Sequence, residues 1–224
     1  MHMHVSKYHL NHLARAEKDV FRMGPQKMKV ELLYHDFPEA NAEVMAEALQ
    51  DRFDVTCSAM LLISPVSVVE MEFGTIAGAA GTTDLSEVME SIAEDLSESS
   101  KDFLQTFTPQ KGNPHQLRIS FIISGVRFSG EVTSDKNEDF LLTFRSIKHL
   151  FLLAERIIAE GRVPDGTISE ELNSAEKDQI RSIESNMASR GQLIRIIIIF
   201  NEKSGSWNVK GVYKEELGVS MERG

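Results

Sequence analysis

The chain has 224 residues, of which 34 are acidic and 24 are basic, so its formal net charge is -10 at pH 7. This sign disfavours nucleic acids and anionic membrane surfaces as partners, because both attract basic patches. The apolar share of 42% and the charged share of 26% are those of a folded globular protein and argue against wholesale disorder.

The single cysteine, Cys57, excludes a disulfide within the chain and favours a reducing compartment. The N-terminal residues lack the apolar stretch and the small-residue cleavage site of a secretory signal. No window approaches the roughly 20 apolar residues that a transmembrane helix needs. We therefore expect a cytoplasmic protein, located in the host cytoplasm if the protein is viral.

The first half of the chain alternates strand-like and helix-like segments. Asp36 and Glu39 form a capping box that predicts the start of a helix. A second capping box, Asp84 with Glu87, opens a long helix with one apolar stripe. The predicted elements are an N-terminal helical arm (1–24), a strand (28–34), a helix (36–53), two strands (55–63 and 66–73) and a helix (84–107).

The second half begins after the turn-rich segment 109–114, which is the best candidate for a linker between two units, 25–108 and 115–224. Residues 140–158 fit either a helix throughout or a strand (140–144) followed by a shorter helix. The other predicted elements are a hairpin (117–124 and 126–133), a helix (167–187) and a terminal hairpin (193–200 and 207–213).

The run from Leu193 to Phe200 contains five isoleucines, whose β-branched side chains suit a strand. We expect it to be a central strand that is buried on both faces. Local hairpins outnumber strict strand–helix alternation, which indicates an α+β fold with antiparallel-rich sheets and three or four amphipathic helices on one side. Whether the segment 109–114 separates two subdomains stays open.

The helix 84–107 carries its carboxylates on the face opposite its apolar stripe. This acidic face is a candidate docking surface for a basic partner, although a solvated helix face has the same pattern. Trp207, the one tryptophan, is a candidate interface anchor or else a core aromatic. The predicted partner-binding residues are Glu87, Glu90, Glu94, Glu98 and Trp207.

The segment 74–81 is rich in small residues and precedes a helix, so its backbone N–H groups could face a phosphate. The candidate phosphate-binding residues are Gly74, Gly78 and Gly81. Their spacing matches neither of the common glycine-rich phosphate motifs, and close packing of a small-residue turn explains it as well.

Two predicted strands each carry polar side chains on one face: Glu31 with His35, and Glu70 with Glu72. If these strands were neighbours, one histidine and three carboxylates could form a metal site or an acid–base site. The alternative is a solvated strand face.

Four of the seven histidines lie in the first twelve residues, where a chain end seldom forms a preorganised metal site. Cys57 lies in an apolar strand, where a cysteine is usually an inert filler. The sequence contains none of the serine-hydrolase, zinc-protease or protein-kinase motifs. We predict no cofactor and no metal.

These observations favour a non-catalytic protein-binding or assembly protein, of the same physical type as immunity proteins, secretion chaperones and viral or phage structural proteins. Its partner would be another protein, which the charge suggests is basic, or a second copy of the chain. The alternative is a small enzyme or nucleotide-binding domain that uses the 74–84 loop or the set Glu31, His35, Glu70 and Glu72.

Overall fold

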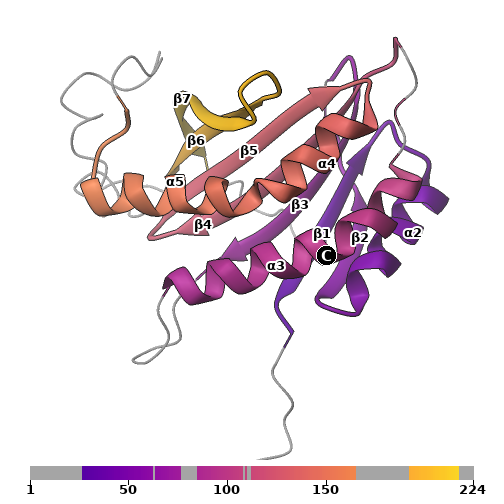
Figure 1. Cartoon of the computed structure of the whole chain (residues 1–224), viewed down its shortest axis with the longest axis horizontal. Helices are drawn as coiled ribbons and strands as arrows, with labels where there is room; N and C mark the ends of the chain where they lie inside the picture. The colour runs from indigo at the N-terminus through magenta and orange to yellow at the C-terminus, as the bar shows by residue number, and fades with distance from the viewer. Residues whose placement is uncertain are drawn as a thin grey trace, which may run out of the picture.

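The computed structural model describes residues 27–62, 64–76, 85–107, 109, 112–164 and 192–216 (Figure 1). The predicted arm 1–24 and the predicted helix 167–187 lie outside these residues. The described helices are α2 (Glu39–Gln50), α3 (Leu85–Thr106), α4 (Asn137–Arg145) and α5 (Ile147–Glu160). The strands are β1 (Lys29–His35), β2 (Asp54–Ala59), β3 (Ser67–Thr75), β4 (His115–Ile123), β5 (Val126–Ser134), β6 (Gln192–Asn201) and β7 (Ser206–Glu216).

The seven strands form one sheet in the order β2-β1-β3-β4-β5-β6-β7, and their pairing confirms the α+β class. The expectation of an antiparallel-rich sheet was wrong, because the sheet is mixed. Three neighbouring pairs (β1/β2, β3/β4 and β5/β6) are parallel, and three (β1/β3, β4/β5 and β6/β7) are antiparallel. Each parallel pair has a helical segment between its strands in the chain, as parallel pairing requires.

Pairing between β3 and β4 joins the two predicted units, because β3 precedes the segment 109–114 and β4 follows it. Strand β4 also pairs along its whole length with β5. One sheet therefore runs through both halves of the chain.

The helices cover one face of this sheet, and Figure 1 shows α3, α4 and α5 in front of the strands. Helix α2, which connects the parallel strands β1 and β2, packs against α3. Apolar residues at alternate strand positions form a single buried cluster with the helices. On β3, β4 and β5 this core set is Val69, Met71, Phe73, Leu117, Ile119, Phe121, Ile123, Val126, Phe128 and Val132.

Strand β6 lies next to the terminal strand of the sheet and is not central. Its residues Ile194, Ile196, Ile198 and Phe200 are buried against the core, whereas Ile199 on the other face is 38% exposed. The expectation that this strand is buried on both faces was therefore wrong. A run of isoleucines shows strand preference, but it does not reveal whether the second face is covered.

The backbone tests two local predictions, the structure of residues 140–158 and the cap of the helix that follows Asp36. Residues 140–158 are helical, as α4 and α5, and Ser146 alone separates the two helices. Asp36 does not cap α2, because the residue at the N-cap is Pro38, whose carbonyl accepts from the N–H groups of Asn41 and Ala42. Asp36 instead has a positive φ of 49° in the turn after β1.

Candidate functional site

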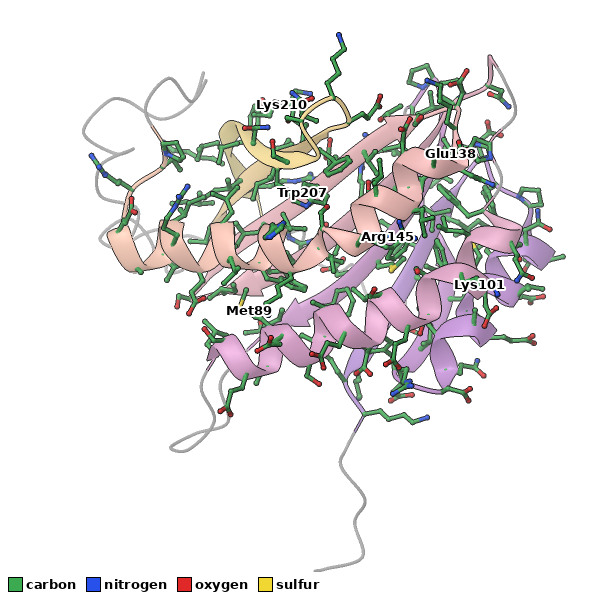
Figure 2. The ribbon with its side chains drawn as sticks, viewed as in Figure 1. Met89, Lys101, Glu138, Arg145, Trp207 and Lys210 are labelled. Atoms are coloured by element: carbon green, nitrogen blue, oxygen red, sulfur yellow. The ribbon has the colours of Figure 1, made fainter. Side chains whose placement is uncertain are left out.

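The predicted acidic face lies on α3, whose opposite side is buried in the core. Met89, on that core side, points toward α5 (Figure 2). The helix buries residues at helical spacing, so the remaining positions face outward. All four predicted carboxylates are exposed: Glu87, Glu90, Glu94 and Glu98.

Two cations from other elements flank this acidic face. On one side Lys148 of α5 forms an ion pair with Glu90, and hydrogen bonding to Glu90 raises the pKa of Lys148. On the other side Arg52, in the turn after α2, contacts Glu98 and lies 3.4 Å from Asp95.

Glu87 and Glu94 make no ion pair with any residue of the described ranges. Exposed ion pairs contribute about 0–1 kcal/mol each. The described residues thus neutralise the acidic face only in part.

A cleft of ≈ 700 Å³ lies between α3 and the turn that joins α2 to β2. Apolar side chains from three segments form its floor, and charged or polar side chains form its rim. The lining residues are Lys27, Met28, Asp51, Arg52, Phe53, Glu87, Val88, Ser91, Ile92 and Asp95. Glu87 belongs to both the acidic face and this rim, so the two features are continuous.

The hypothesis about Glu31, His35, Glu70 and Glu72 depended on whether their strands are neighbours, and β1 and β3 are antiparallel neighbours. Glu31 lies directly opposite Glu72, Leu33 opposite Glu70, and His35 opposite Val68. All four residues therefore lie on the sheet face opposite the helices.

The carboxylates of Glu31, Glu70 and Glu72 already form hydrogen bonds or ion pairs with other side chains. Ser58 donates a hydrogen bond of 3.0 Å to Glu31, and Ser120 donates one to Glu70. Arg127 lies 3.0 Å from Glu72. Among the described residues no group of three or more histidine, cysteine, aspartate or glutamate side chains could hold a metal ion.

An ionic network extends from these carboxylates across β4, β5 and β6. Arg118 lies 3.9 Å from Glu70 and 3.5 Å from Glu131, and Arg195 lies 3.6 Å from Glu131. Ser120 and Ser129 occupy the centre, 2.9 Å apart and fully buried. We call this set the polar face: Glu70, Glu72, Arg118, Ser120, Arg127, Ser129, Glu131 and Arg195.

Sequence reasoning did not predict the polar face as a unit. The available signal was one or two charged residues inside each of these strands, because a buried charge needs a partner from a neighbouring strand. Burial raises the pKa of Glu72 above its ordinary value, while the Arg127 guanidinium acts in the opposite direction.

Glu31, Glu72 and Gly74 line a smaller pocket of ≈ 310 Å³, which Glu70 and His35 do not line. Gly74 has a positive φ of 62°, and a side chain there would meet nothing within 4 Å. Gly78 and Gly81, the other two candidate phosphate-binding residues, lie outside the described residues. Of the four side chains in the proposed acid–base set, two therefore share this pocket.

Trp207 is buried, at 7% exposure, between the terminal hairpin and the helices (Figure 2). Its indole N–H donates to the carbonyl oxygen of Ser146 at 3.1 Å and to the Ser146 hydroxyl at 3.0 Å. Its ring packs at 5.2 Å from that of Phe200. These contacts match the core role that the sequence allowed for Trp207.

Cys57 is half-buried on β2, and burial raises the pKa of its thiol. A thiol with a raised pKa is a weaker nucleophile at neutral pH, because less of it is ionised.

No protein-family model, curated protein or solved structure matches this chain. Within the described ranges, no helix combines the length and the apolar character needed to cross a membrane.

Proposed function

We propose that this chain is a non-catalytic protein-binding protein that docks a basic partner on the acidic face of α3. The observation that carries the proposal is the row of exposed carboxylates on that helix. Two of them, Glu87 and Glu94, form no ion pair within the described residues, whereas Glu90 and Glu98 each pair with one cation. A cytoplasmic location, expected from the lone cysteine, is part of the same proposal.

The repulsion between neighbouring carboxylates on α3 favours a docking surface over a helix face that is only solvated. Glu90 with Glu94, and Glu94 with Glu98, are like charges four residues apart, which destabilise a helix by about 0.2–0.5 kcal/mol per pair. A basic partner would remove this repulsion. The same field accelerates encounter with a positively charged surface, and salt weakens it.

A selection from a random peptide library, with the purified protein as the target, tests the proposal. We expect basic peptides to be enriched and to lose binding to the variant Glu87→Lys/Glu90→Lys/Glu94→Lys. A matched control carries the same charge change elsewhere on the exposed surface: Glu47→Lys/Glu138→Lys/Glu202→Lys. Neutral or acidic peptides that bind all three proteins equally would refute the proposal.

A second copy of the chain is the other candidate partner. Among the described strands β2 pairs only with β1, and β7 only with β6, so both are edges that another strand could extend. Light scattering after size-exclusion chromatography, at low and moderate salt, decides this point. A monomer at both salt concentrations would end the assembly reading and leave the basic partner.

The enzyme or nucleotide-binding alternative has one supporting observation, the pocket shared by Glu31, Glu72 and Gly74. The pocket is lined by three carboxylates (Glu31, Asp54 and Glu72) and one cation (Lys29), and this excess of negative charge repels a phosphate and disfavours a nucleotide there. A thermal-shift series with nucleotides would support this alternative if a nucleotide stabilised the parent protein and if Glu72→Gln, which removes one repelling carboxylate, increased that stabilisation.

A further inference from the structure

We propose that the cleft between α3 and the α2–β2 turn binds an amphipathic helix of the partner, with an arginine of that helix taking the place of Arg52. This inference rests on the proposed function, because it names the site and the chemistry through which the acidic face would bind. It adds an apolar component that the carboxylates alone do not supply.

The shape of the cleft is the first argument. Its α3 wall consists of Glu87, Val88, Ser91, Ile92 and Asp95, which form one stripe along the helix. From residue 87 to residue 95 this stripe is about 12 Å long, at 1.5 Å per residue. Grooves of this kind take a helix that inserts apolar side chains at three- and four-residue spacing.

The floor of the cleft is apolar and already well ordered. Phe53 is 2% exposed and Ile92 is 3% exposed, so both are fixed in the core. Met28 and Val88 are half-buried and present part of their surface to the cleft. At ≈ 700 Å³ the space lies within the range of ligand pockets, about 300–1,000 Å³, and has room for more than one side chain.

The charges on the rim decide what can enter. The cleft is lined by three carboxylates (Asp51, Glu87 and Asp95) and two cations (Lys27 and Arg52). Lys27 donates a hydrogen bond of 2.6 Å to the carbonyl oxygen of Gln50 at the end of α2. Its charge is therefore used at the helix C-terminus, where cations are favoured.

The contacts of Arg52 show what the carboxylates at the rim and directly beside it bind: Asp95 lines the cleft, and Glu98 is the next carboxylate along α3. The two terminal nitrogens of Arg52 contact Asp95 and Glu98, which lie three residues apart on α3 and so face the same way. A planar guanidinium is the cation best suited to such a pair of carboxylates. The Arg52 side chain is 48% exposed, and ion pairs at that exposure are weak, so a partner's arginine can displace it.

The probe is a short helical peptide with leucines on one face and arginines on the other, measured by fluorescence anisotropy. A second peptide has glutamine in place of each arginine. We expect the arginine peptide to bind, more weakly as salt rises, and the glutamine peptide not to bind.

Two matched pairs of variants locate the site. Arg52→Gln frees Asp95 and Glu98, and Lys148→Gln removes the same charge by freeing Glu90 outside the cleft. We expect Arg52→Gln to bind about two- to fivefold tighter, as loss of a competing exposed ion pair allows, and Lys148→Gln to change affinity little. Ser91→Trp fills the cleft, whereas Ser97→Trp places the same bulk on an exposed position of α3 that does not line it. Binding should be lost in Ser91→Trp alone.

Equal tightening by Arg52→Gln and Lys148→Gln, or equal binding by the two tryptophan variants, would overturn the cleft proposal. Peptide binding would then reflect general attraction to α3, and the proposed function would stand. If neither the parent protein nor any variant bound the arginine peptide, the cleft proposal would be overturned. The library selection would still test the proposed function separately.

Discussion

Arg127 and Arg195 lie directly opposite each other on the parallel strands β5 and β6, on the polar face. Two like charges in this position repel, so counter-charges must hold them. Glu72, two strands away on β3, contacts Arg127 at 3.0 Å, and Glu131 lies 3.6 Å from Arg195. The contact between Glu72 and Arg127 crosses β4, where Ser120 lies opposite Glu72 and Ile122 lies opposite Arg127.

Glu131 is the shared counter-ion of this network. Its carboxylate lies near both Arg118 and Arg195, and its side chain is 10% exposed. We expect Glu131→Gln to lower the free energy of unfolding by about 3 kcal/mol, because the mostly buried Arg195 guanidinium loses its counter-charge and Arg118 keeps only the more distant Glu70. Urea denaturation measures the loss.

The exposed Glu160, which pairs with Arg156 and Arg162, provides the control. Glu160→Gln should change the free energy of unfolding by less than about 1 kcal/mol. Equal effects of the two substitutions would show that the polar face contributes no more than a surface ion pair.

Glu72 should make stability depend on pH. Its pKa in the folded protein is raised above the ordinary value of 4.5, so the folded form binds the proton more tightly than the unfolded form. Its contribution to stability is therefore complete below pH 4.5 and is lost as the pH rises through the folded pKa. Urea denaturation of the parent protein and Glu72→Gln at several pH values measures this, and the difference in stability, parent minus variant, should fall as the pH rises.

Direct titration of the Glu72 carboxyl by carbon NMR provides an independent check on that interpretation. A midpoint below the ordinary value would mean that the Arg127 guanidinium outweighs burial, and the stability difference between parent and variant should then rise with pH instead of falling. A midpoint at the ordinary value would mean that the two effects cancel, and the difference should then not depend on pH.

Gly130 on β5 allows α5 to approach the sheet closely. A Cβ atom there would lie 2.5 Å from a terminal carbon of Leu150 and 3.2 Å from the Trp207 ring. We expect Gly130→Ala to cost about 1–3 kcal/mol of stability by overpacking. In a double-mutant cycle with Leu150→Ala, the combined loss should be smaller than the sum of the single losses. Simple additivity would contradict the contact.

Trp207 should contribute through its hydrogen bonds as well as through its buried ring. Trp207→Phe keeps an aromatic ring but removes the N–H group that donates to Ser146. We therefore expect the free energy of unfolding to fall by about 1–2 kcal/mol, as measured by denaturation followed by circular dichroism. Because it is the only tryptophan, its emission in the parent protein should shift to longer wavelength on unfolding. An emission maximum that is the same in buffer and in urea would contradict its burial.

Sequence periodicity predicted most individual elements. The strand at 28–34 became β1, the helix at 84–107 became α3, and the turn at Ser124 and Gly125 closes the β4–β5 hairpin with positive φ at both residues. These signals are local, since each depends on residues within a few positions of one another. The predicted strand 55–63 was too long, because β2 ends at Ala59.

The mixed sheet was not predicted, because strands that are neighbours in the sheet can be far apart in the sequence. Nothing within β3 or β4 indicates that they pair in parallel, with Glu70 beside Arg118. The acidic face of α3 could be predicted, because one helical period determines it. The cleft could not, since Arg52 and Phe53 come from a turn that precedes α3 by more than thirty residues.

The pairing of β3 with β4 has a consequence for how the chain folds. During synthesis β3 is complete before β4 exists, so the edge of β3 that pairs with β4 has no neighbour until the next strand has left the ribosome. Cutting the chain within 109–114 would leave two fragments, each with an open edge that matches the other. Such fragments would pair with each other or aggregate through their open edges. In the intact chain the two edges are covalently connected, so they pair within one molecule.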